Sequence, residues 1–399
     1  MLAYAAKSSV PMPMSETIEP QADTSDTQAA DHWSRALRTE TPAEFGRDVF
    51  WQSIPEVNRY YTVGACGGDE RFPSWIDYCL DFLRGRLPVE RMLSVGCGAG
   101  SLERFLAMRG AFRQCDAWDI ASGAVETARR LALREGYTHI AYDVRDANTY
   151  VPPPEFYDAV WFNSSLHHVA ELETVLAGIS RSLKPGGFLF LNEYVGASVF
   201  DFPPRQREAM FAALDLIPKR FRRRFPDGAV VEQLALPTPA EVAAVDPSES
   251  VRSAEILGVV GDAFEVLACN PAGGTLLQFL LNGIAGNFQP EDPESMKVLD
   301  MILKIERTLI EVGDLPSDFV LVVARRREPP PPPRPRVRTV RPPAAPEPEP
   351  ARSAEEVRLR AEIESLRAKL RQVESTRFWR AAHLYYAGRR RLRRWLGLA

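Results

Sequence analysis

The residues best suited to chemistry form a turn with three glycines, Gly96, Gly98 and Gly100, directly after a run of apolar residues. A helical pattern of apolar residues begins after the last glycine. Because glycine adopts positive φ without strain, such a turn lets a ligand approach bare backbone at the carboxyl end of a strand. The turn predicts a nucleoside-binding site, although its G-x-G-x-G spacing differs from the G-x-G-x-x-G of dinucleotide binders.

A carboxylate, Asp119, ends the next apolar run. It follows the turn by about 20 residues, where an α/β nucleoside site places an acid on the ribose hydroxyls. An ionised carboxylate only accepts hydrogen bonds and therefore suits a diol. The competing interpretation is a cap for the following helix, a role for which Ser122 also competes. The spacing favours ribose binding.

Two further polar groups follow the third and fourth apolar runs. Asp146 and Ala147 come after the third, where a carboxylate accepts from an exocyclic adenine amine and a backbone N–H donates to the ring. The competing interpretation of Asp146 is a solvated turn acid. After the fourth run, His167 is the candidate general base, because histidine titrates near neutral pH. His168 and Glu193 stand behind it, and the alternative is that both histidines only support the loop.

The elements that carry these residues alternate between short apolar runs and helical patterns, which is typical of βαβ units around a parallel sheet. The predicted strands are Arg91–Val95, Gln114–Asp119, Ile140–Val144, Tyr157–Asn163, Phe188–Glu193, Phe264–Cys269 and Asp318–Arg325. The predicted helices of this region are Ser101–Met108, Ser122–Glu135, Leu172–Leu183, Thr275–Ile284 and Pro293–Val312. The two late strands, separated from the others by an insertion, would complete a seven-stranded sheet.

Six motifs in order resemble those of class I S-adenosylmethionine-dependent methyltransferases: Ser94–Gly100, Asp119–Ser122, Asp146–Ala147, Tyr157–Val160, Asn163–His168 and Leu183–Gly187. The resemblance covers about residues 90–195. It implies an α/β, Rossmann-like seven-stranded sheet with a reversed final strand, S-adenosylmethionine as cofactor, and methyl transfer.

Carried over by position, the resemblance implies that Gly96, Gly98 and Gly100 line the methionine moiety of the cofactor. It likewise assigns the ribose to Asp119, the adenine to Asp146 and Ala147, and a cofactor-binding role to Asn163. Ser94 departs from the family, which usually has an acid there that helps to position the methionine amino group.

Composition changes divide the chain. Residues 1–30 are polar and acidic and are expected to be disordered. Residues 31–327 are expected to form the methyltransferase domain, with its core at 90–195 and a helical lid at 196–260. A proline-rich linker follows at 328–350, and residues 351–399 are predicted to form a helical tail rich in arginine and aromatic residues.

The composition also limits the class of protein. The chain has 399 residues, 45% of them hydrophobic, and a formal net charge of -4, which argues against a general nucleic-acid binder. Its five cysteines form no C-x-x-C pair, which indicates reduced thiols and no metal site. No signal peptide or membrane-spanning run is evident, and we expect a cytoplasmic protein.

The segments around the core suggest an acceptor. Phe50–Trp51, Arg59–Tyr61 and Arg71 are expected to close over the site, and Arg252, at the start of a predicted helix, suits an anionic or polyhydroxylated ligand. The arrangement loosely resembles bacterial methyltransferases of surface-glycan assembly, which implies O-methylation of a sugar hydroxyl.

Other acceptors and partners stay open. The alternatives are a small-molecule methyltransferase of unrelated metabolism, a nicotinamide dehydrogenase, and a non-catalytic scaffold on the same fold. The tail is expected to bind an anionic membrane surface, at the inner face, or a glycosyltransferase partner, in preference to RNA.

Overall fold

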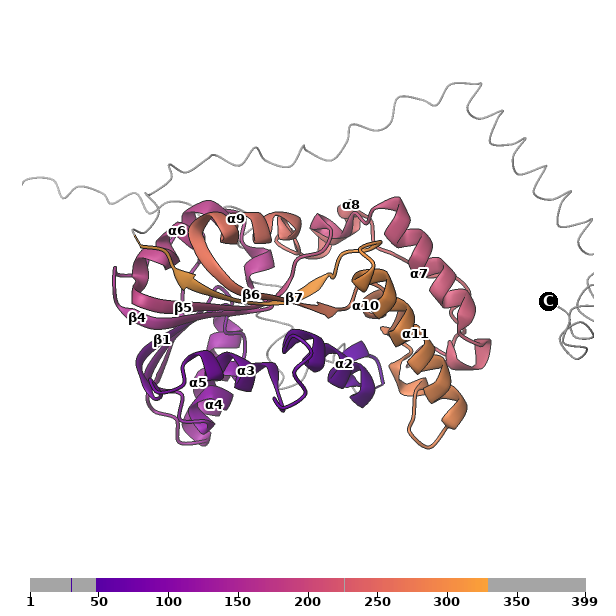
Figure 1. Cartoon of the computed structure of the whole chain (residues 1–399), viewed down its shortest axis with the longest axis horizontal. Coiled ribbons are helices and arrows are strands. Elements are labelled where there is room, and N and C mark those ends of the chain that lie inside the picture. The colour runs from indigo at the N-terminus through magenta and orange to yellow at the C-terminus, as the bar shows by residue number, and fades with distance from the viewer. Residues whose placement is uncertain (1–29, 31–47, 226, 329–399) are drawn as a thin grey trace, which may run out of the picture. The chain divides into compact units, whose positions relative to one another are not determined.

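The computed structural model describes residue 30, residues 48–225 and residues 227–328 (Figure 1). The segment expected to be disordered, apart from residue 30, lies outside the described residues. The linker beyond residue 328 and the whole 351–399 tail lie outside them as well, so the division into these parts stays a prediction.

One seven-stranded sheet organises the described part of the chain. Its order is β3-β2-β1-β4-β5-β7-β6, and every neighbouring pair is parallel except the two that involve β7. The strands are β1 (Val89–Val95), β2 (Phe112–Asp119), β3 (Ile140–Val144), β4 (Tyr157–Asn163), β5 (Leu183–Tyr194), β6 (Phe264–Gly273) and β7 (Phe319–Arg326). The predicted seven-stranded α/β sheet with a reversed final strand is confirmed.

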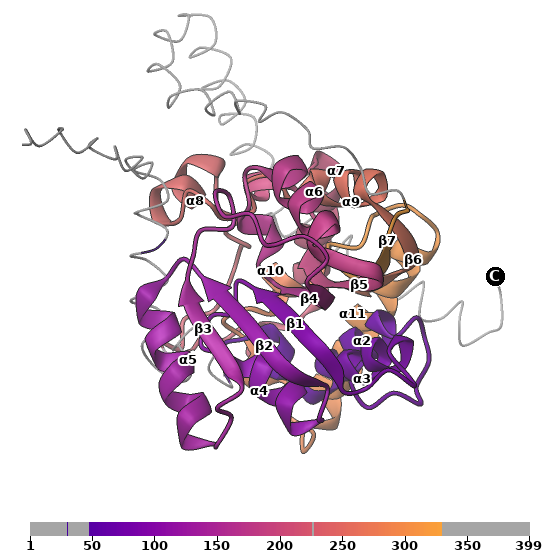
Figure 2. The same cartoon turned by 90° about the vertical axis from the view of Figure 1, so that its left-hand side faces the viewer.

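Helices cover both faces of this sheet and its β6–β7 end (Figures 1 and 2). The α-helices are α2 (Pro55–Ala65), α3 (Trp75–Phe82), α4 (Ser101–Met108), α5 (Ser122–Arg134), α6 (Leu172–Ser182), α7 (Pro204–Leu216), α8 (Pro239–Val245), α9 (Ile256–Ala263), α10 (Leu277–Leu281) and α11 (Pro293–Glu311). The 3-10 turns are η2 (Trp51–Ser53), η3 (Leu166–His168), η4 (Ser198–Phe200), η5 (Lys219–Phe221), η6 (Ser253–Glu255) and η7 (Ala285–Asn287).

Side chains that alternate along the central strands build two hydrophobic layers. On β4, Trp161 faces the layer formed with α3, α4 and α5, whereas Val160 and Phe162 face the layer formed with α6 and α9. Trp161 packs against Phe190 of β5 with ring centroids 4.3 Å apart and the two ring planes tilted by 30°. Because parallel strands are buried on both faces, they read as continuous apolar runs in the sequence.

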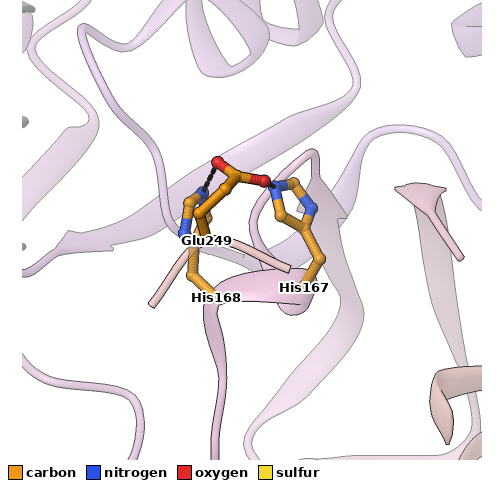
Figure 3. A group of neighbouring side chains, drawn as sticks. All are labelled: His167, His168 and Glu249. Atoms are coloured by element: carbon orange, nitrogen blue, oxygen red, sulfur yellow. Dashed lines mark ion pairs between the residues drawn. The ribbon is translucent and has the colours of Figure 1, made fainter. Parts of the chain in front are cut away.

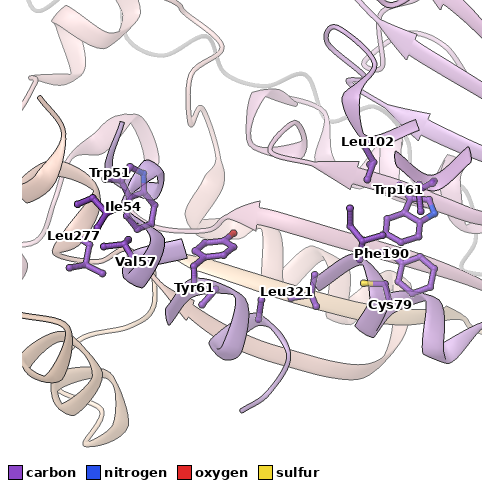
Figure 4. Packing of buried hydrophobic residues seen from close by; sticks show 14 of the residues in the cluster. Trp51, Ile54, Val57, Tyr61, Cys79, Leu102, Trp161, Phe190, Leu277 and Leu321 are labelled. Carbon is purple, nitrogen blue, oxygen red and sulfur yellow. The ribbon is translucent and has the colours of Figure 1, made fainter. Parts of the chain in front are cut away.

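The first layer continues past the sheet into a second apolar region beneath β6 and β7 (Figure 4). Trp51 and Tyr61 are buried there, and both rings contact Phe319 of β7. The expectation that Phe50–Trp51 and Arg59–Tyr61 form a lid is therefore wrong for these two aromatic side chains, which bury apolar surface in the core. Arg71 pairs with Asp69 at the surface.

Most predicted element boundaries agree with the structure to within a few residues. The exceptions are β5, which begins at Leu183 and carries the Lys184–Gly187 turn as an irregularity in its pairing with β4, and α10, which is shorter than predicted. None of the described helices has the length and apolar character needed to cross a bilayer.

Replacing Phe190 by alanine is expected to lower the free energy of unfolding by about 3–5 kcal/mol, because the cavity would lie against Trp161 in the centre of the sheet. Urea denaturation followed by circular dichroism measures this loss. The control is Phe211→Ala on α7, whose side chain is 45% exposed and whose removal should change stability by about 0.5 kcal/mol or less. Equal losses in the two variants would contradict this description of the core.

Candidate cofactor and acceptor site

A cavity of about 700 Å³ opens at the carboxyl ends of β1, β2 and β4. Six of the residues predicted to bind the cofactor line it: Gly96, Gly98, Asp119, Asp146, Ala147 and Asn163. Gly100 and His167 are not among the lining residues, whereas His168 is. The structure thus gathers most of the predicted cofactor residues around one cavity, although their individual roles stay predictions.

The glycine turn has the conformation that the sequence predicts. Gly96, Gly98 and Gly100 all have positive φ, at 71°, 51° and 76°. A Cβ at position 96 would lie 2.3 Å from the Cβ of Ser165, and one at position 100 would lie 2.6 Å from the hydroxyl of Tyr142. Only glycine fits these two positions, and at Gly100 the reason is packing against β3 instead of ligand access.

Asp119 serves the turn itself. Its two carboxylate oxygens accept the backbone N–H groups of Gly98 and Ala121, each at 2.8 Å. Burial raises the pKa of this carboxyl, and the N–H groups offset part of that rise. Because a carboxylate oxygen has more than one lone pair, Asp119 can hold the turn and still accept from a ribose hydroxyl. Helix α5 has Ala121 as its N-cap and no side-chain cap, so the capping interpretation of Asp119 is wrong, while ribose binding stays a prediction.

Asp146 is engaged in a local turn, as its competing interpretation proposes. One carboxylate oxygen accepts both the backbone N–H and the side-chain amide of Asn148, at 2.8 and 3.1 Å. The oxygen of Asn148 in turn accepts the N–H groups of Ala170 and Glu171. These bonds connect the loop after β3 to the start of α6 and fix the backbone of Ala147 along the cavity wall.

A buried carboxylate at the end of β5 organises the loop after β4. Glu193 is fully buried, and its Oε1 accepts the N–H groups of Ser165 and Leu166, both at 2.7 Å. Its Oε2 lies 2.8 Å from Nδ1 of His167. Since a carboxylate only accepts, this contact places a proton on Nδ1 of His167. Glu193 is thus a positioning residue for the predicted base.

The neighbouring His168 lies at the cavity wall. Its Nδ1 is 3.0 Å from the hydroxyl of Ser248, which donates to Asp246 at 2.7 Å. Burial lowers the pKa of His168, and the charge on His167 lowers it further. Burial also opposes charge on His167, but its hydrogen bond to Glu193 and the nearby carboxylates outweigh this, so its pKa is raised. The histidine next to the cavity is therefore the one that favours the neutral form.

The predicted lid contributes little to the cavity. Of residues 196–260, as far as the structure describes them, only Ser248 lines it. Arg252 pairs with Glu173 at 2.7 Å and with Glu255 at 2.6 Å, and it also donates to the carbonyl of Ala170. Its guanidinium fastens the 246–252 segment to α6, so the expectation that Arg252 receives an anionic ligand gains nothing from the geometry.

One cavity residue that was not predicted is Glu103 of α4. Its side chain is fully buried, and neither carboxylate oxygen forms a hydrogen bond of normal geometry with the described residues. Burial raises its pKa to about 7, and the nearby Ser94 hydroxyl offsets only part of the effect. A cationic group would satisfy this carboxylate, and S-adenosylmethionine carries one in its amino group. The polar groups that line the cavity therefore fit S-adenosylmethionine, even though Ser94 stands where the family usually has an acid.

Part of the chain is similar to known methyltransferases. Residues 93–191 match the family described as "Methyltransferase domain". The chain is 31% identical over 120 residues to a ubiquinone biosynthesis O-methyltransferase of Leptothrix cholodnii, covering 30% of this chain and 48% of the relative. It is 36% identical over 116 residues to the protein of that name from Xanthomonas campestris, covering 28% and 47%.

The chain therefore spans about half the length of these curated relatives. Among solved structures, geranyl diphosphate C-methyltransferase of Streptomyces coelicolor aligns with a TM-score of 0.44 at 14% identity, over 77% of this chain and 100% of that one. Phosphoethanolamine N-methyltransferase 2 of Haemonchus contortus aligns with a TM-score of 0.39 at 17% identity, over 69% and 58%. The family match places most of the cavity residues within a stretch that is similar to methyltransferase domains.

Replacing Glu193 by glutamine tests the buried carboxylate. The amide keeps one acceptor oxygen but turns an N–H₂ donor toward other donors, so we expect a loss of about 1–3 kcal/mol in the free energy of unfolding. Chemical denaturation measures it. The control is Glu265→Gln, which removes half of an exposed pair with Arg325 and should cost less than about 1 kcal/mol. Unchanged stability in Glu193→Gln would show that this carboxylate does not hold the loop.

Proposed function

We propose that the chain transfers a methyl group from S-adenosylmethionine to a hydroxyl group of an acceptor, for which the sequence suggests a sugar. One observation carries the proposal. One cavity contains the glycine turn, the Asp119 carboxylate, the buried Glu103 carboxyl and, farther along its wall, polar side chains next to a histidine and carboxylate cluster.

On the cofactor side, Glu103 is proposed to take the part of the acid that Ser94 lacks. It comes from the helix after the turn instead of from the strand before it, but it lines the same cavity. An ammonium group beside a buried carboxylate favours the ionised form and replaces lost solvation. Asp119 is proposed to bind the ribose, and the backbone of Ala147 the adenine.

S-adenosylmethionine supplies a methyl group on a sulfonium. In the transfer, the oxygen of the acceptor forms a bond to the methyl carbon, and the carbon–sulfur bond breaks with its electron pair going to sulfur. The cluster of His167, His168 and Glu249 accepts the proton of the hydroxyl, directly or through a water molecule. The rest of the cavity supplies alignment and exclusion of water.

The lining of the cavity supports a polar acceptor. Beyond the glycine turn its wall is formed by Asn163, Ser164, His168 and Ser248, which offer hydrogen-bond partners to a polyhydroxylated molecule. The curated relatives are named for O-methylation in ubiquinone biosynthesis, which is consistent with an oxygen acceptor. A small phenolic acceptor is therefore the second candidate.

The cytoplasmic location and the attachment of residues 351–399 to an anionic membrane or a glycosyltransferase remain part of this proposal. They depend on residues outside the described part of the chain.

Glu103 makes cofactor binding depend on pH. Its contribution to stability is complete below its unfolded pKa of 4.5 and is lost as pH rises through about 7, because folding favours the protonated form. A bound ammonium favours the ionised form instead. We expect affinity for S-adenosylmethionine to rise by up to about tenfold per pH unit below pH 7. Calorimetry between pH 5.5 and 7.5 measures this slope.

The Glu103→Gln variant should bind S-adenosylmethionine about 10- to 100-fold more weakly at pH 7.5, with a much flatter pH profile. Glu135→Gln is a matched control, because Glu135 also lines the cavity but pairs with Arg104. A pH slope that persists in Glu103→Gln would remove the proposed role. Binding of NAD in place of S-adenosylmethionine would overturn the methyltransferase proposal altogether.

The activity is tested with labelled S-adenosylmethionine and a panel of glycans, free sugars and small phenols. We expect label on a sugar hydroxyl, and turnover reduced about 10²- to 10³-fold in His168→Ala and in His167→Ala, with unchanged cofactor affinity. Near-normal turnover of His167→Ala would exclude catalysis through His167. Transfer only to phenols would replace the acceptor class, and intact cofactor binding without any transfer would favour a non-catalytic scaffold.

A further inference from the structure

Three side chains from two distant segments meet beside the cavity (Figure 3). His167 and His168 belong to η3, and Glu249 belongs to the segment that Arg252 fastens to α6. Nε2 of His167 lies 3.8 Å from Oε1 of Glu249, and Nε2 of His168 lies 3.9 Å from Oε2. Each ring therefore faces one oxygen of the same carboxylate, at a distance too long for a hydrogen bond.

The far side of each ring fixes its tautomer. Nδ1 of His167 contacts the Glu193 carboxylate, which can only accept, and Nδ1 of His168 contacts the hydroxyl of Ser248, which already donates to Asp246. Both Nδ1 atoms therefore carry the proton. In the neutral form of each ring, the lone pair is then on Nε2, the atom that faces Glu249.

This is the arrangement of a metal site with its supporting shell. Histidine ligands commonly donate their other N–H to a carboxylate or a hydrogen-bonded oxygen, which orients the ring. Metal–nitrogen and metal–oxygen bonds are about 2.0–2.2 Å, so ligand atoms on one ion stand about 3–4 Å apart. The candidate ligand atoms of the three residues all lie within 4.8 Å of one another, so small side-chain rotations suffice.

We propose that His167, His168 and Glu249 bind a divalent first-row transition metal ion, with zinc as the reference case. Two imidazoles and one carboxylate suit such an ion better than Mg²⁺, which prefers oxygen ligands. Three protein ligands leave at least one position open. His168 and its partner Ser248 line the cavity, so the open position is accessible from there.

The ion gives the cluster a defined role in the proposed methyl transfer, on which this part of the inference rests. A hydroxyl group of the acceptor would bind at the open position, on the part of the cavity wall formed by His168 and Ser248. Coordination to a divalent ion lowers the pKa of a bound oxygen acid, so the proton leaves to water near neutral pH. The resulting alkoxide would attack the methyl carbon, and with the ion bound His167 and His168 would act as ligands, so that water and not the cluster accepts the proton.

The experiment uses the full chain without a histidine tag, freed of metal by a chelator and then dialysed. Zn²⁺ binding is followed by calorimetry, with metal content by mass spectrometry, and Co²⁺ replaces Zn²⁺ for absorption spectroscopy. We expect one tightly bound ion per chain and visible Co²⁺ bands of low-symmetry nitrogen and oxygen coordination.

Variants locate the site. Glu249→Gln and His168→Ala should weaken binding about 100-fold or more. Ser248→Ala, which removes the hydrogen-bond partner of His168 but no ligand, should weaken it about 10-fold. His139→Ala is the matched control, because His139 is exposed at the far edge of the sheet before β3. Circular dichroism verifies the fold of each variant, and the Co²⁺ bands of the unaltered chain test the site without any substitution.

The inference is overturned if the wild-type chain binds no ion below about 100 μM, or if binding and Co²⁺ bands persist unchanged in Glu249→Gln and His168→Ala. Binding of S-adenosylmethionine to the metal-free chain is measured in parallel. If the wild-type chain binds no metal ion but does bind S-adenosylmethionine, this inference alone is rejected. Failure to bind the cofactor, with the metal site present, would reject the proposed function instead.

Discussion

The carboxylate of Glu193 is the contact on which the rest of the site depends. It ends β5 in the middle of the sheet and holds the first residues of the loop after β4 by their backbone N–H groups. Ser165, fixed in this way, donates its hydroxyl to the carbonyl of Val95 at the end of β1 and packs against Gly96. Farther along the same turn, the backbone N–H of Gly98 donates a hydrogen bond to the carboxylate of Asp119 at the end of β2. A single buried acid thus connects the loop that carries the histidines, through the end of β1, to the turn and the second strand. Because a buried carboxylate is stable only when it is well hydrogen-bonded, this arrangement tolerates little change.

Much of this fold follows from the sequence, because its strands are buried on both faces and appear as uninterrupted apolar runs. Tyr157–Asn163 and Ile140–Val144 have the predicted limits, and helix α4 begins where the glycines end. The cofactor side was predictable for the same reason: the carboxyl ends of parallel strands meet at one edge, so residues that follow them gather there. Aromatic residues before the core were less informative. Trp51 and Tyr61 were expected in a lid, but both pack into the apolar layer beside β7. The sequence does not say which surface an aromatic side chain meets.

The rest of the site could not be read from spacing. Glu249 and Ser248 reach the histidines through a turn that Arg252 anchors to α6, and no periodic pattern records that contact. The sequence also does not show which histidine lies at the cavity wall, because adjacent residues in a 3-10 turn point in different directions. Which of the two faced the cavity depended on Glu193, a residue of another strand. Asp119 and Asp146 show a further difficulty. Each accepts backbone N–H groups of the loops around it, although Asp119 does not cap α5, and each also lines the cavity. Local and ligand-binding roles are not exclusive for a group with several lone pairs.

Glu103 has a consequence for recognising inactive enzymes by sequence. Chains with this fold that lack the usual acid before the glycine turn are easily classified as pseudoenzymes, and Ser94 invites that classification here. A negative charge in the same cavity can instead be delivered from the first turn of the following helix, where the backbone dipoles also favour an anion. If Glu103 performs that task, the two positions are interchangeable sources of one electrostatic property. Restoring an acid at position 94 would then be harmful, since two neighbouring buried carboxylates would repel each other, and only the exchange of both residues would be neutral.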